Sequence, residues 1–466
     1  MDGVARVATP SFFCVHRKAH VFKAIGRIFK TRDLRRKILF TLAIVAAFRL
    51  GSFIPAPFVD YGNVQACLAS NVTDTAGLYQ LVNLFSGGAL LQLSVFALGI
   101  MPYITASIIV QLLRVVIPRF EALYKEGQTG QSKLTQYTRY LTIGLGVLQS
   151  TTLIAVVRSG QLFSAGGAVP AGSPCADLLT NEAWWAIVLM VVAMTAGTGV
   201  IMWMGELITE RGIGNGMSLL IFTSIAATFP SALFLIGETN GIEMLVAVLA
   251  IGVVIMGAVV FVEQSQRRIP VQYAKRMVGR RMYGGKSTYI PIKVNMAGVV
   301  PVIFASSLLY FPALIASFNS PRAGEQPAEW VQWINDNLTT GDHPLYMVLY
   351  FLLIIGFTYF YVAITFNPDD VAENMRKYGG FIPGIRAGRP TAEYLDYVLT
   401  RVTFPGSIYL GIVALIPLIA LATVGANQNF PFGGASILII VGVGLETVRQ
   451  IDAQLQQRHY EGLIRT

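Results

Sequence analysis

The sequence of 466 residues is poor in charge, because only 13% of its residues are Asp, Glu, Lys or Arg, while 54% are hydrophobic. A soluble domain typically carries about 25% charged residues. Half that density cannot cover a water-facing surface of this size, and the hydrophobic content is too high for a disordered chain. A mean hydropathy of +0.58 also argues against a soluble nucleic-acid-binding protein, although the net charge is +10. These numbers favour a polytopic membrane protein.

Residues and motifs typical of metal binding, nucleotide binding or catalysis are scarce as well. Three cysteines exclude a disulfide scaffold and a cysteine-built metal site. The four histidines lie outside the long apolar runs, and the chain has no H-E-x-x-H, P-loop or G-x-S-x-G motif. A G-x-G-x-G run from Gly212 to Gly216 precedes an apolar run in a short loop, which makes it a weak nucleotide site. The sequence predicts no cofactor and no enzyme activity.

Long apolar runs are what the chain has in their place. A helix that crosses the ~30 Å hydrocarbon core needs about 20 mostly apolar residues. Ten such spans are predicted near 38–57, 91–113, 139–157, 184–204, 216–236, 242–262, 297–318, 345–366, 402–424 and 432–448. The predicted fold is therefore an all-α polytopic membrane protein with ten transmembrane helices.

The positive charges alternate from loop to loop. Of the 35 Lys and Arg residues, 32 lie in the two termini and in the loops after spans 2, 4, 6 and 8, and the opposite loops hold only Arg158 and Arg322. Because Lys and Arg accumulate in cytoplasmic loops, both termini are predicted to be cytoplasmic. With Asp and Glu counted as well, the formal charge is +18 on the predicted cytoplasmic side and −8 on the predicted outer side.

Five spans on each side of residues 237–241 predict two halves of opposite orientation, an inverted repeat. In chain order, the predicted parts begin with a basic cytoplasmic tail (1–37), an N-terminal half (38–236) and an external hinge (237–241). A C-terminal half (242–448) with cytoplasmic loops 263–296 and 367–401 follows, and the chain ends in a cytoplasmic tail (449–466).

Two prolines occupy matching places in these halves. Pro102 lies between Ile100 and Ile104, and Pro301 lies between Val299 and Ile303. Proline kinks a helix, and matched helix breaks mark the working site of many transport proteins. Prolines are also common in membrane helices, so a purely structural origin is equally open. Upstream, residues 78–113 carry no charge and include a Gly pair, which predicts a short re-entrant or half-helix segment over about 78–90 or, alternatively, an external amphipathic helix.

Few polar groups lie within the spans. Apart from Arg139 and Glu243 at span ends, Arg49 and Glu446 are the two charged residues, and Arg49 needs a partner or a polar cavity. Thr105, Gln149 and Asn295 are neutral polar residues that suit either interhelical contacts that open and close or permanent helix contacts. A secondary transporter predicts buried charges at the midplane, and a membrane enzyme predicts a catalytic cluster, so a channel explains these spans better.

The two long basic loops, 263–296 and 367–401, carry eight and five Lys or Arg residues. Such loops suit anionic lipid, RNA phosphates or an acidic protein surface. A docking role is favoured because fewer charges would satisfy topology.

Several long segments resemble the SecY/Sec61-alpha family, whose bacterial SecY members are channel subunits of the Sec protein translocase. They are NLFSGGALLQLSVFALGIMPYITASIIVQLL (83–113), KEGQTGQSKLTQYTRY (125–140), GELITERGIGNGMS (205–218), QRRIPVQYAKRMVGRR (266–281), KVNMAGVVPVIFASS (293–307), NPDDVAENMRKYGGFIPGIRAG (367–388) and FGGASILII (432–440).

The resemblance implies a channel that passes unfolded secretory polypeptides across the bacterial cytoplasmic membrane and releases membrane helices sideways through a lateral gate between spans 2–3 and 7–8. It implies a pore ring, in which Met217 replaces the usual isoleucine. The implied ring residues are Ile100, Ile104, Met217, Ile221, Ile303 and Ile439. The implied plug contains Asn83, Phe85, Ser86, Gly87 and Gly88, and the implied lateral-gate polar cluster is Thr105, Gln149 and Asn295.

The implied partners are the small SecE and SecG membrane subunits, the SecA ATPase, the ribosome with its rRNA, signal sequences with nascent polypeptides, and membrane lipids. The implied docking residues for cytosolic partners are Arg280, Arg281 and Arg386.

Two features depart from the family. Residues 1–20 match nothing in it, so we expect translation to start at Val21 from a non-AUG codon, which the intact mass of the native protein would test. Cys67 and Cys175 fall in predicted external loops, where an oxidising exterior would permit a disulfide, but two unpaired thiols are slightly favoured because nothing in the sequence brings the two loops together.

Overall fold

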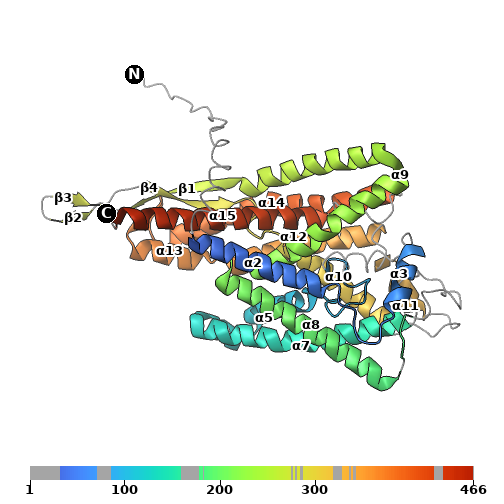
Figure 1. The fold of residues 1–466 in the computed structure, drawn as a ribbon. Coiled ribbons are helices and arrows are strands. Elements are labelled where there is room, and N and C mark those ends of the chain that lie inside the picture. Colours follow the sequence, from blue (N-terminus) through green and yellow to red (C-terminus); the bar gives the residue numbers. More distant parts are fainter. Residues whose placement is uncertain are drawn as a thin grey trace.

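The structure is a computed structural model of the whole chain. It describes residues 32–70, 86–158, 178–181, 183–273, 276–278, 281–283, 287–318, 328–334, 337–338, 343–424 and 434–464. Most of these residues are helical (Figure 1).

The first half of the described chain is built from helices. They are α2 (Arg32–Gly51), α3 (Tyr61–Ser70), α5 (Met101–Val116), α6 (Pro118–Lys125), α7 (Gln128–Arg158) and α8 (Trp184–Arg211). Residues 87–100, between α3 and α5, form turns rather than a helix. The prediction of one helix over 91–113 is therefore wrong, and span 2 is an irregular segment followed by a helix.

Helix α9 (Gly216–Gln264) joins the two halves. Its backbone breaks at Gly241, where φ is 83° and ψ is 167°. Glycine takes this conformation without the steric penalty of a Cβ atom. The predicted hinge at 237–241 is thus a sharp reversal at one residue, visible as the hairpin of α9 in Figure 1.

The second half contains the remaining helices. They are α10 (Val300–Phe318), α11 (Glu329–Ile334), α12 (Pro344–Thr365), α13 (Pro368–Lys377), α14 (Arg389–Val424) and α15 (Gly434–Ile464). The start of helix α13 is well defined, since Asn367 caps it by accepting from the Asp369 N–H at 3.1 Å and Pro368 begins it.

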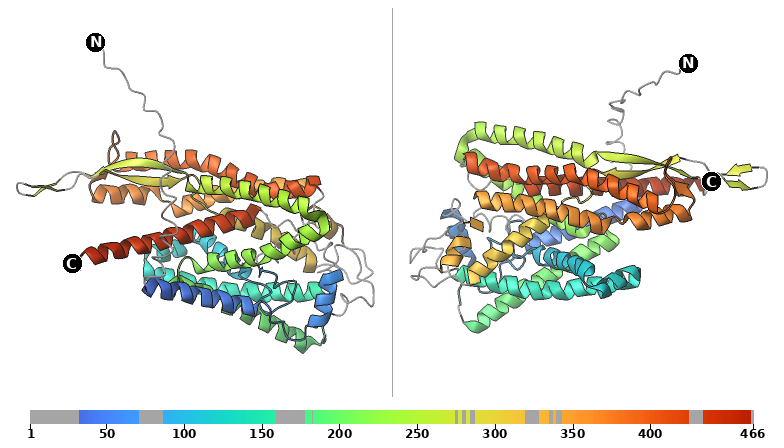
Figure 2. Two further views of the ribbon diagram at one scale, coloured as in Figure 1. Left: turned by 45° about the horizontal axis from the view of Figure 1, so that its top comes forward. Right: turned by 180° about the vertical axis from the view of Figure 1, so that it is seen from behind.

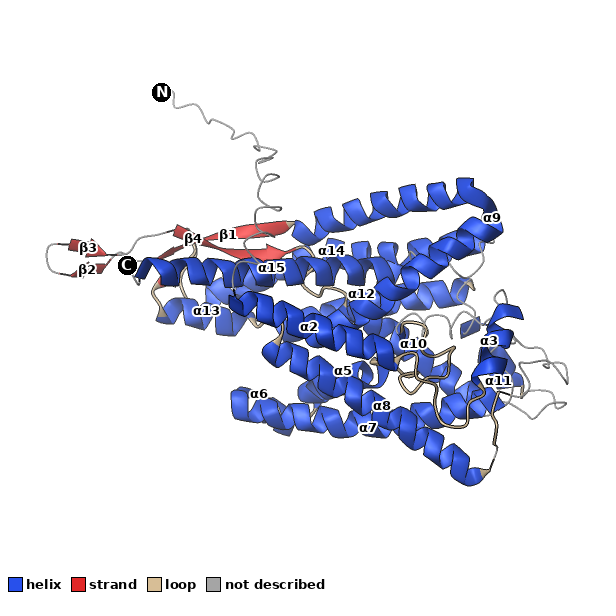
Figure 3. Ribbon diagram, viewed as in Figure 1, coloured by secondary structure: helices blue, strands red, loops and turns tan. Residues whose placement is uncertain are grey.

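The loop 263–296 contains strands, which the all-α prediction did not include. They are β1 (Gln266–Tyr273), β2 (Arg276–Val278), β3 (Arg281–Tyr283) and β4 (Ser287–Lys293). Strand β1 pairs antiparallel with β4 and with β5 (Gly380–Phe381), and β2 pairs with β3. The alternation of buried Ile269 and Val271 with exposed neighbours gives β1 one apolar face. The strands lie at one end of the helices, and the β2–β3 hairpin projects beyond them (Figures 2 and 3).

Six described helices are long and apolar enough to cross a membrane, and the bent pair α5–α6 makes seven. Helix α10 adds a shorter apolar stretch, Val300–Leu309. The chain is therefore a multi-pass membrane protein, while the count of ten spans and their inverted arrangement stay predictions.

Several helices extend well past the predicted spans. Helix α7 begins at Gln128, α14 begins at Arg389, and α15 runs to Ile464 through the predicted C-terminal tail. Hydropathy marks where an apolar run ends, but charged residues in water do not end a helix.

Four apolar cores hold the described chain together. One contains residues of the first half only, a second joins α9 to α10, α12, α14 and α15, and a third lies where β1 and β4 meet α12, α13 and α14. The fourth takes residues from both halves and carries the candidate site.

Candidate pore and gate

The six predicted ring residues lie in this fourth cluster, which we call the central cluster. Ile100, Ile221, Ile303 and Ile439 are among its buried members, and Ile104 and Met217 pack against them half-buried. The exposed fraction of Ile439 is 1% and that of Ile100 is 2%. These side chains therefore share one buried apolar cluster.

The starts of α5 and α10 position three of these residues. Gly99 has φ of 55° and Gly298 has φ of 61°, and each turns the chain three residues before a proline. The amide of Ile104 donates to the Ile100 carbonyl at 3.1 Å, and the amide of Ile303 donates to the Val299 carbonyl at 3.3 Å. The two halves thus begin these helices with the same backbone pattern.

The prediction that Pro102 and Pro301 kink their helices is wrong. Pro102 lies in the first turn of α5, and Pro301 is the second residue of α10. Proline is accommodated in a first turn, because the N–H that it lacks has no helical acceptor there. Both prolines therefore mark the boundary between an irregular segment and a helix.

Helix α9 supplies Met217 and Ile221 from its first two turns. The Asn215 side chain caps α9 by accepting from the Met217 amide at 3.1 Å. Gly205 of α8 makes room for Met217, since a Cβ atom at position 205 would lie 2.4 Å from the Met217 sulfur. The thioether is thus packed against a neighbouring helix rather than loose.

The irregular segment 86–100 lies inside the helices. Its backbone bonds to the loop after α2, with the Ala56 amide donating to the Leu93 carbonyl at 3.0 Å and the Val95 amide donating to the Ile54 carbonyl at 2.9 Å. These bonds satisfy non-helical backbone that is buried among the helices, where unpaired polar groups are costly. Of the predicted plug residues, Ser86, Gly87 and Gly88 begin this segment, and Asn83 and Phe85 lie outside the described residues.

Arg49 is held by this segment. Its Nη1 donates to the Gly87 carbonyl oxygen at 2.6 Å, and its guanidinium lies 5.3 Å from the centre of the Phe53 ring. Gly87 has φ of 71°, and a Cβ there would lie 3.0 Å from Arg49 Nη1. The expected partner of Arg49 is therefore a backbone carbonyl of the predicted plug.

The three residues of the predicted polar cluster, Thr105, Gln149 and Asn295, are all buried. Thr105 donates to the Met101 carbonyl of its own helix at 3.0 Å. Asn295 donates to Glu263 Oε1 at 2.5 Å and to the Gly298 carbonyl at 3.2 Å. Glu263 was missed, because the sequence prediction ended span 6 at residue 262 and treated it as a loop residue.

A hydrogen bond crosses between the two halves near the end of α5. Arg114 Nη2 donates to the Ile364 carbonyl in the last turn of α12 at 3.3 Å, and its guanidinium lies 3.7 Å from the centre of the Tyr124 ring. A cation at a helix C-terminus is favourable, because the last carbonyls have no helical donors. Below we call the boundary of α5 and α7 with α10 and α12 the seam. Tyr103, Gln111, Arg114 and Thr138 are among the residues that line a cavity of about 250 Å³ beside it.

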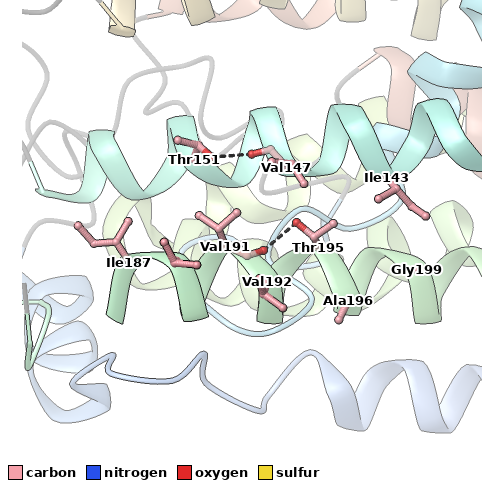
Figure 4. Close-up of a pocket in the computed structure, with 10 residues that line it drawn as sticks. Ile143, Val147, Thr151, Ile187, Val191, Val192, Thr195, Ala196 and Gly199 are labelled. Carbon is pink, nitrogen blue, oxygen red and sulfur yellow. Dashed lines mark hydrogen bonds between the residues drawn. The ribbon is translucent and has the colours of Figure 1, made fainter. Parts of the chain in front are cut away.

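A groove of about 600 Å³ lies between α7 and α8 (Figure 4). Its lining is aliphatic, and its Thr151 and Thr195 hydroxyls donate to the Val147 and Val191 carbonyls of their own helices, each at 2.7 Å. Each of these two hydroxyls thus uses its donor within its own helix.

The predicted docking residues lie at the end that carries the strands. Arg281 begins β3 of the projecting hairpin, and Arg386 lies exposed in the loop between β5 and α14. The Arg386 carbonyl accepts from the Thr391 hydroxyl at 2.9 Å, which ties this loop to the start of α14. Arg280 lies outside the described residues.

Cys67 is fully buried in α3 and is disulfide-bonded. Its expected partner, Cys175, lies outside the described residues, so the pairing stays a prediction. Within the described ranges, no group of three or more His, Cys, Asp or Glu side chains is placed to hold a metal ion.

The fold and the central cluster define a class. A multi-pass helical protein whose two halves meet at a buried aliphatic cluster, with irregular backbone inside the helices, is built as a membrane channel or transporter. The fold is also that of solved channels. It is similar to a structure described as "The structure of a protein conducting channel", with a TM-score of 0.59 at 18% identity over 89% of this chain and 91% of that one. It is similar to Sec61 in the canine ribosome-channel complex, with a TM-score of 0.58 at 18% identity over the same shares.

Sequence relatives identify the family. The SecY family model matches residues 94–448. The protein translocase subunits SecY of Streptomyces coelicolor and Mycobacterium tuberculosis are 64% and 56% identical, covering 95% and 94% of this chain and 99% and 98% of those proteins. The chain belongs to the SecY family.

Proposed function

We propose that this chain is the protein-conducting channel of a Sec translocase, which passes unfolded secretory polypeptides across the bacterial cytoplasmic membrane. The observation that carries the proposal is the central cluster. It brings six apolar side chains, from Ile100 and from the helices α5, α9, α10 and α15, to one place between the halves.

An aliphatic constriction suits this task for a physical reason. A polypeptide carries both polar and apolar side chains, so a lining that binds neither kind strongly lets the chain slide. Ions do not cross such a constriction, because apolar side chains offer no groups to replace the hydration shell of an ion. Side chains that separate without breaking polar bonds also close again at little cost.

The seam is the proposed lateral gate. It is formed by α5 and α7 of the first half and by α10 and α12 of the second half, and α10 contacts both α5 and α7. We propose that signal sequences and membrane helices leave the channel here into lipid. Thr105 lies on α5, Gln149 lies on α7, and Asn295 lies in the connection between β4 and α10.

We propose that the segment that contains Gly87 and Gly88 is the root of a plug that blocks the outer side of the resting channel. The Arg49–Gly87 hydrogen bond supports this proposal, because it holds the segment beside the central cluster. Phe48 of the same helix and Phe96 of the same segment are both members of that cluster.

The proposed partners follow from the two ends of the molecule. The projecting β2–β3 hairpin and the loop with Arg386 form the landing surface for the ribosome, including its rRNA, and for SecA. Small SecE and SecG subunits complete the membrane complex, which lies in the bacterial cytoplasmic membrane with both termini of this chain in the cytoplasm. The charge difference of +18 against −8 supports this orientation.

Reconstitution tests the function. The chain is placed in vesicles with SecE and SecG, SecA and ATP are added, and a secretory precursor is supplied. We expect the precursor to become protected from external protease. Absence of protection with every component folded would contradict the proposal.

A further inference from the structure

The Asn295 side chain is buried and has an unusual distribution of hydrogen bonds. Its exposed fraction is 4%, and its Nδ2 donates to both Glu263 and the Gly298 carbonyl. Its Oδ1 is buried and accepts no hydrogen bond within the described chain. The residue thus uses both donors of its amide while its acceptor stays open.

The sheet brings Glu263 to this place. Strand β1 pairs with β4 so that Gln266 lies opposite Lys293, and the Val294 amide donates to the Ser265 carbonyl at 3.1 Å. Residues after β4 therefore run alongside the end of α9. This register places Asn295, the second residue after β4, beside the last turn of α9, where Glu263 lies.

The two acceptors decide which way the amide faces. A carboxylate oxygen and a carbonyl oxygen can only accept, so both require the NH₂ side of Asn295. Rotating the amide by 180° would bring its oxygen against two other oxygens. Glu263 and the Gly298 carbonyl therefore fix the orientation of Oδ1.

A buried acceptor without a donor is unfavourable, so it binds a donor that reaches it. Asn295 lies five residues before the start of α10, and α10 lines the seam. An N–H or O–H donor that reaches Oδ1 meets an acceptor whose direction is already set, so no entropy is lost in orienting the amide.

We propose that Glu263 is a positioning residue for the lateral gate: it holds the Asn295 amide so that Oδ1 presents a fixed acceptor to polar donors of an entering polypeptide. The inference rests on the proposed function, because it assumes that the seam opens to polypeptide. It adds a residue on a different helix that acts through Asn295 without lining the seam.

Two substitutions separate the acceptor role of Glu263 from its charge. Glu263→Gln keeps an oxygen that accepts from Asn295 Nδ2, whereas Glu263→Leu removes it at similar size. Asn295→Leu removes the amide itself. Glu446→Leu removes an exposed carboxylate from α15 and serves as the matched control.

The readout is signal-sequence discrimination in reconstituted vesicles. It is the ratio of translocation of a precursor with a shortened apolar signal segment to that of the same precursor with the full segment. We expect Glu263→Leu and Asn295→Leu each to change this ratio about fivefold in the same direction. Glu263→Gln and Glu446→Leu should stay within twofold of the unchanged protein, and translocation of the full precursor controls for folding.

The double variant Glu263→Leu with Asn295→Leu completes the test. If Glu263 acts through Asn295, the double variant equals the single Asn295 variant, because residues that act as a unit are not additive. A multiplied effect, or an unchanged ratio in Glu263→Leu beside a changed one in Asn295→Leu, would overturn the inference alone. Unchanged ratios in both single variants would also overturn the gate role of Asn295.

Discussion

The starts of α5 and α10 have the same backbone conformation and hydrogen-bond pattern, but the segments before them are bonded to different parts of the molecule. Each start has a glycine with positive φ, two residues, a proline, and two amides that donate to the carbonyl of the residue after the glycine. Before α5 lies the irregular segment 86–100, bonded to Arg49 and to the loop after α2. Before α10 lies strand β4, with Asn295 bonded to Glu263.

This difference indicates how the two halves are connected to the rest of the molecule. The same backbone start aims an isoleucine of each half at the central cluster. The start of α5 is held by Arg49 and by the loop after α2, whereas the start of α10 is connected to the sheet at the end that carries the proposed docking residues. We therefore expect the binding of a partner to the sheet to move α10 more directly than α5.

The largest expected effect is at the cluster itself. Ile104→Gly with Ile303→Gly removes two aliphatic side chains from opposite halves and should raise small-ion leakage through the reconstituted resting channel at least tenfold. Each single change should raise it to a similar extent if the two starts are equivalent. Planar-bilayer conductance measures this, with Leu349→Gly, an exposed residue of α12, as the control. Unchanged conductance in the double variant would argue against the cluster as a seal.

The second-largest effect is expected from breaking the hydrogen bond between Arg49 and the Gly87 carbonyl. Arg49→Ala leaves the Gly87 carbonyl without its donor, and an unpaired buried carbonyl costs about 1–3 kcal/mol. We expect more leakage at rest and a lower midpoint of thermal unfolding in detergent. Arg49→Lys keeps a donor and should restore part of both. Equal leakage in the alanine variant and the unchanged protein would separate Arg49 from the plug.

The turn glycines test the shared backbone pattern. Gly298→Ala places a side chain at φ of 61°, which costs about 1–2 kcal/mol even though no atom lies within 4 Å of the new Cβ. Gly298→Asn should cost less, because Asn tolerates this conformation better. Thermal unfolding in detergent measures both, and an alanine variant as stable as the asparagine variant would contradict a left-handed turn at this position.

The smallest effect is expected from weakening the Arg114–Ile364 hydrogen bond across the seam. Arg114→Gln weakens the hydrogen bond to the Ile364 carbonyl and removes the favourable charge at the end of α12, a loss of about 1 kcal/mol. We expect a modest gain in translocation of precursors with weakened signal sequences. Lys125→Gln, which removes an exposed cation of the neighbouring α6, is the matched control. Equal gains in both variants would assign the effect to loop charge.

The sequence predicted a multi-pass helical protein and most of its long apolar helices, because these depend on composition. It located the matched prolines but predicted kinks where the structure has helix starts. It did not predict that residues 91–100 are irregular, since an apolar run has the same hydropathy as a helix or as packed turns. Gly99 and Gly298 precede the prolines by three residues, and that spacing was the available signal for helix starts rather than kinks.

The candidate site was predicted in part for a similar reason. Family resemblance brought together the six ring residues, which the structure gathers in one cluster. Glu263 was missed because its partnership with Asn295 depends on the β1–β4 register, 32 residues apart in sequence. The Arg114–Ile364 bond joins residues 250 positions apart and has no sequence signal.

Cross-linking to a polypeptide halted in the channel tests the central claim most directly. A photoreactive side chain is placed at Ile439, which is 1% exposed in the central cluster, or at Val254 of α9, which is 71% exposed. A precursor fused to a tightly folded domain is then arrested during translocation. The account predicts strong cross-links to the precursor from position 439 and none above background from position 254. Cross-links from position 254 with none from position 439 would contradict it.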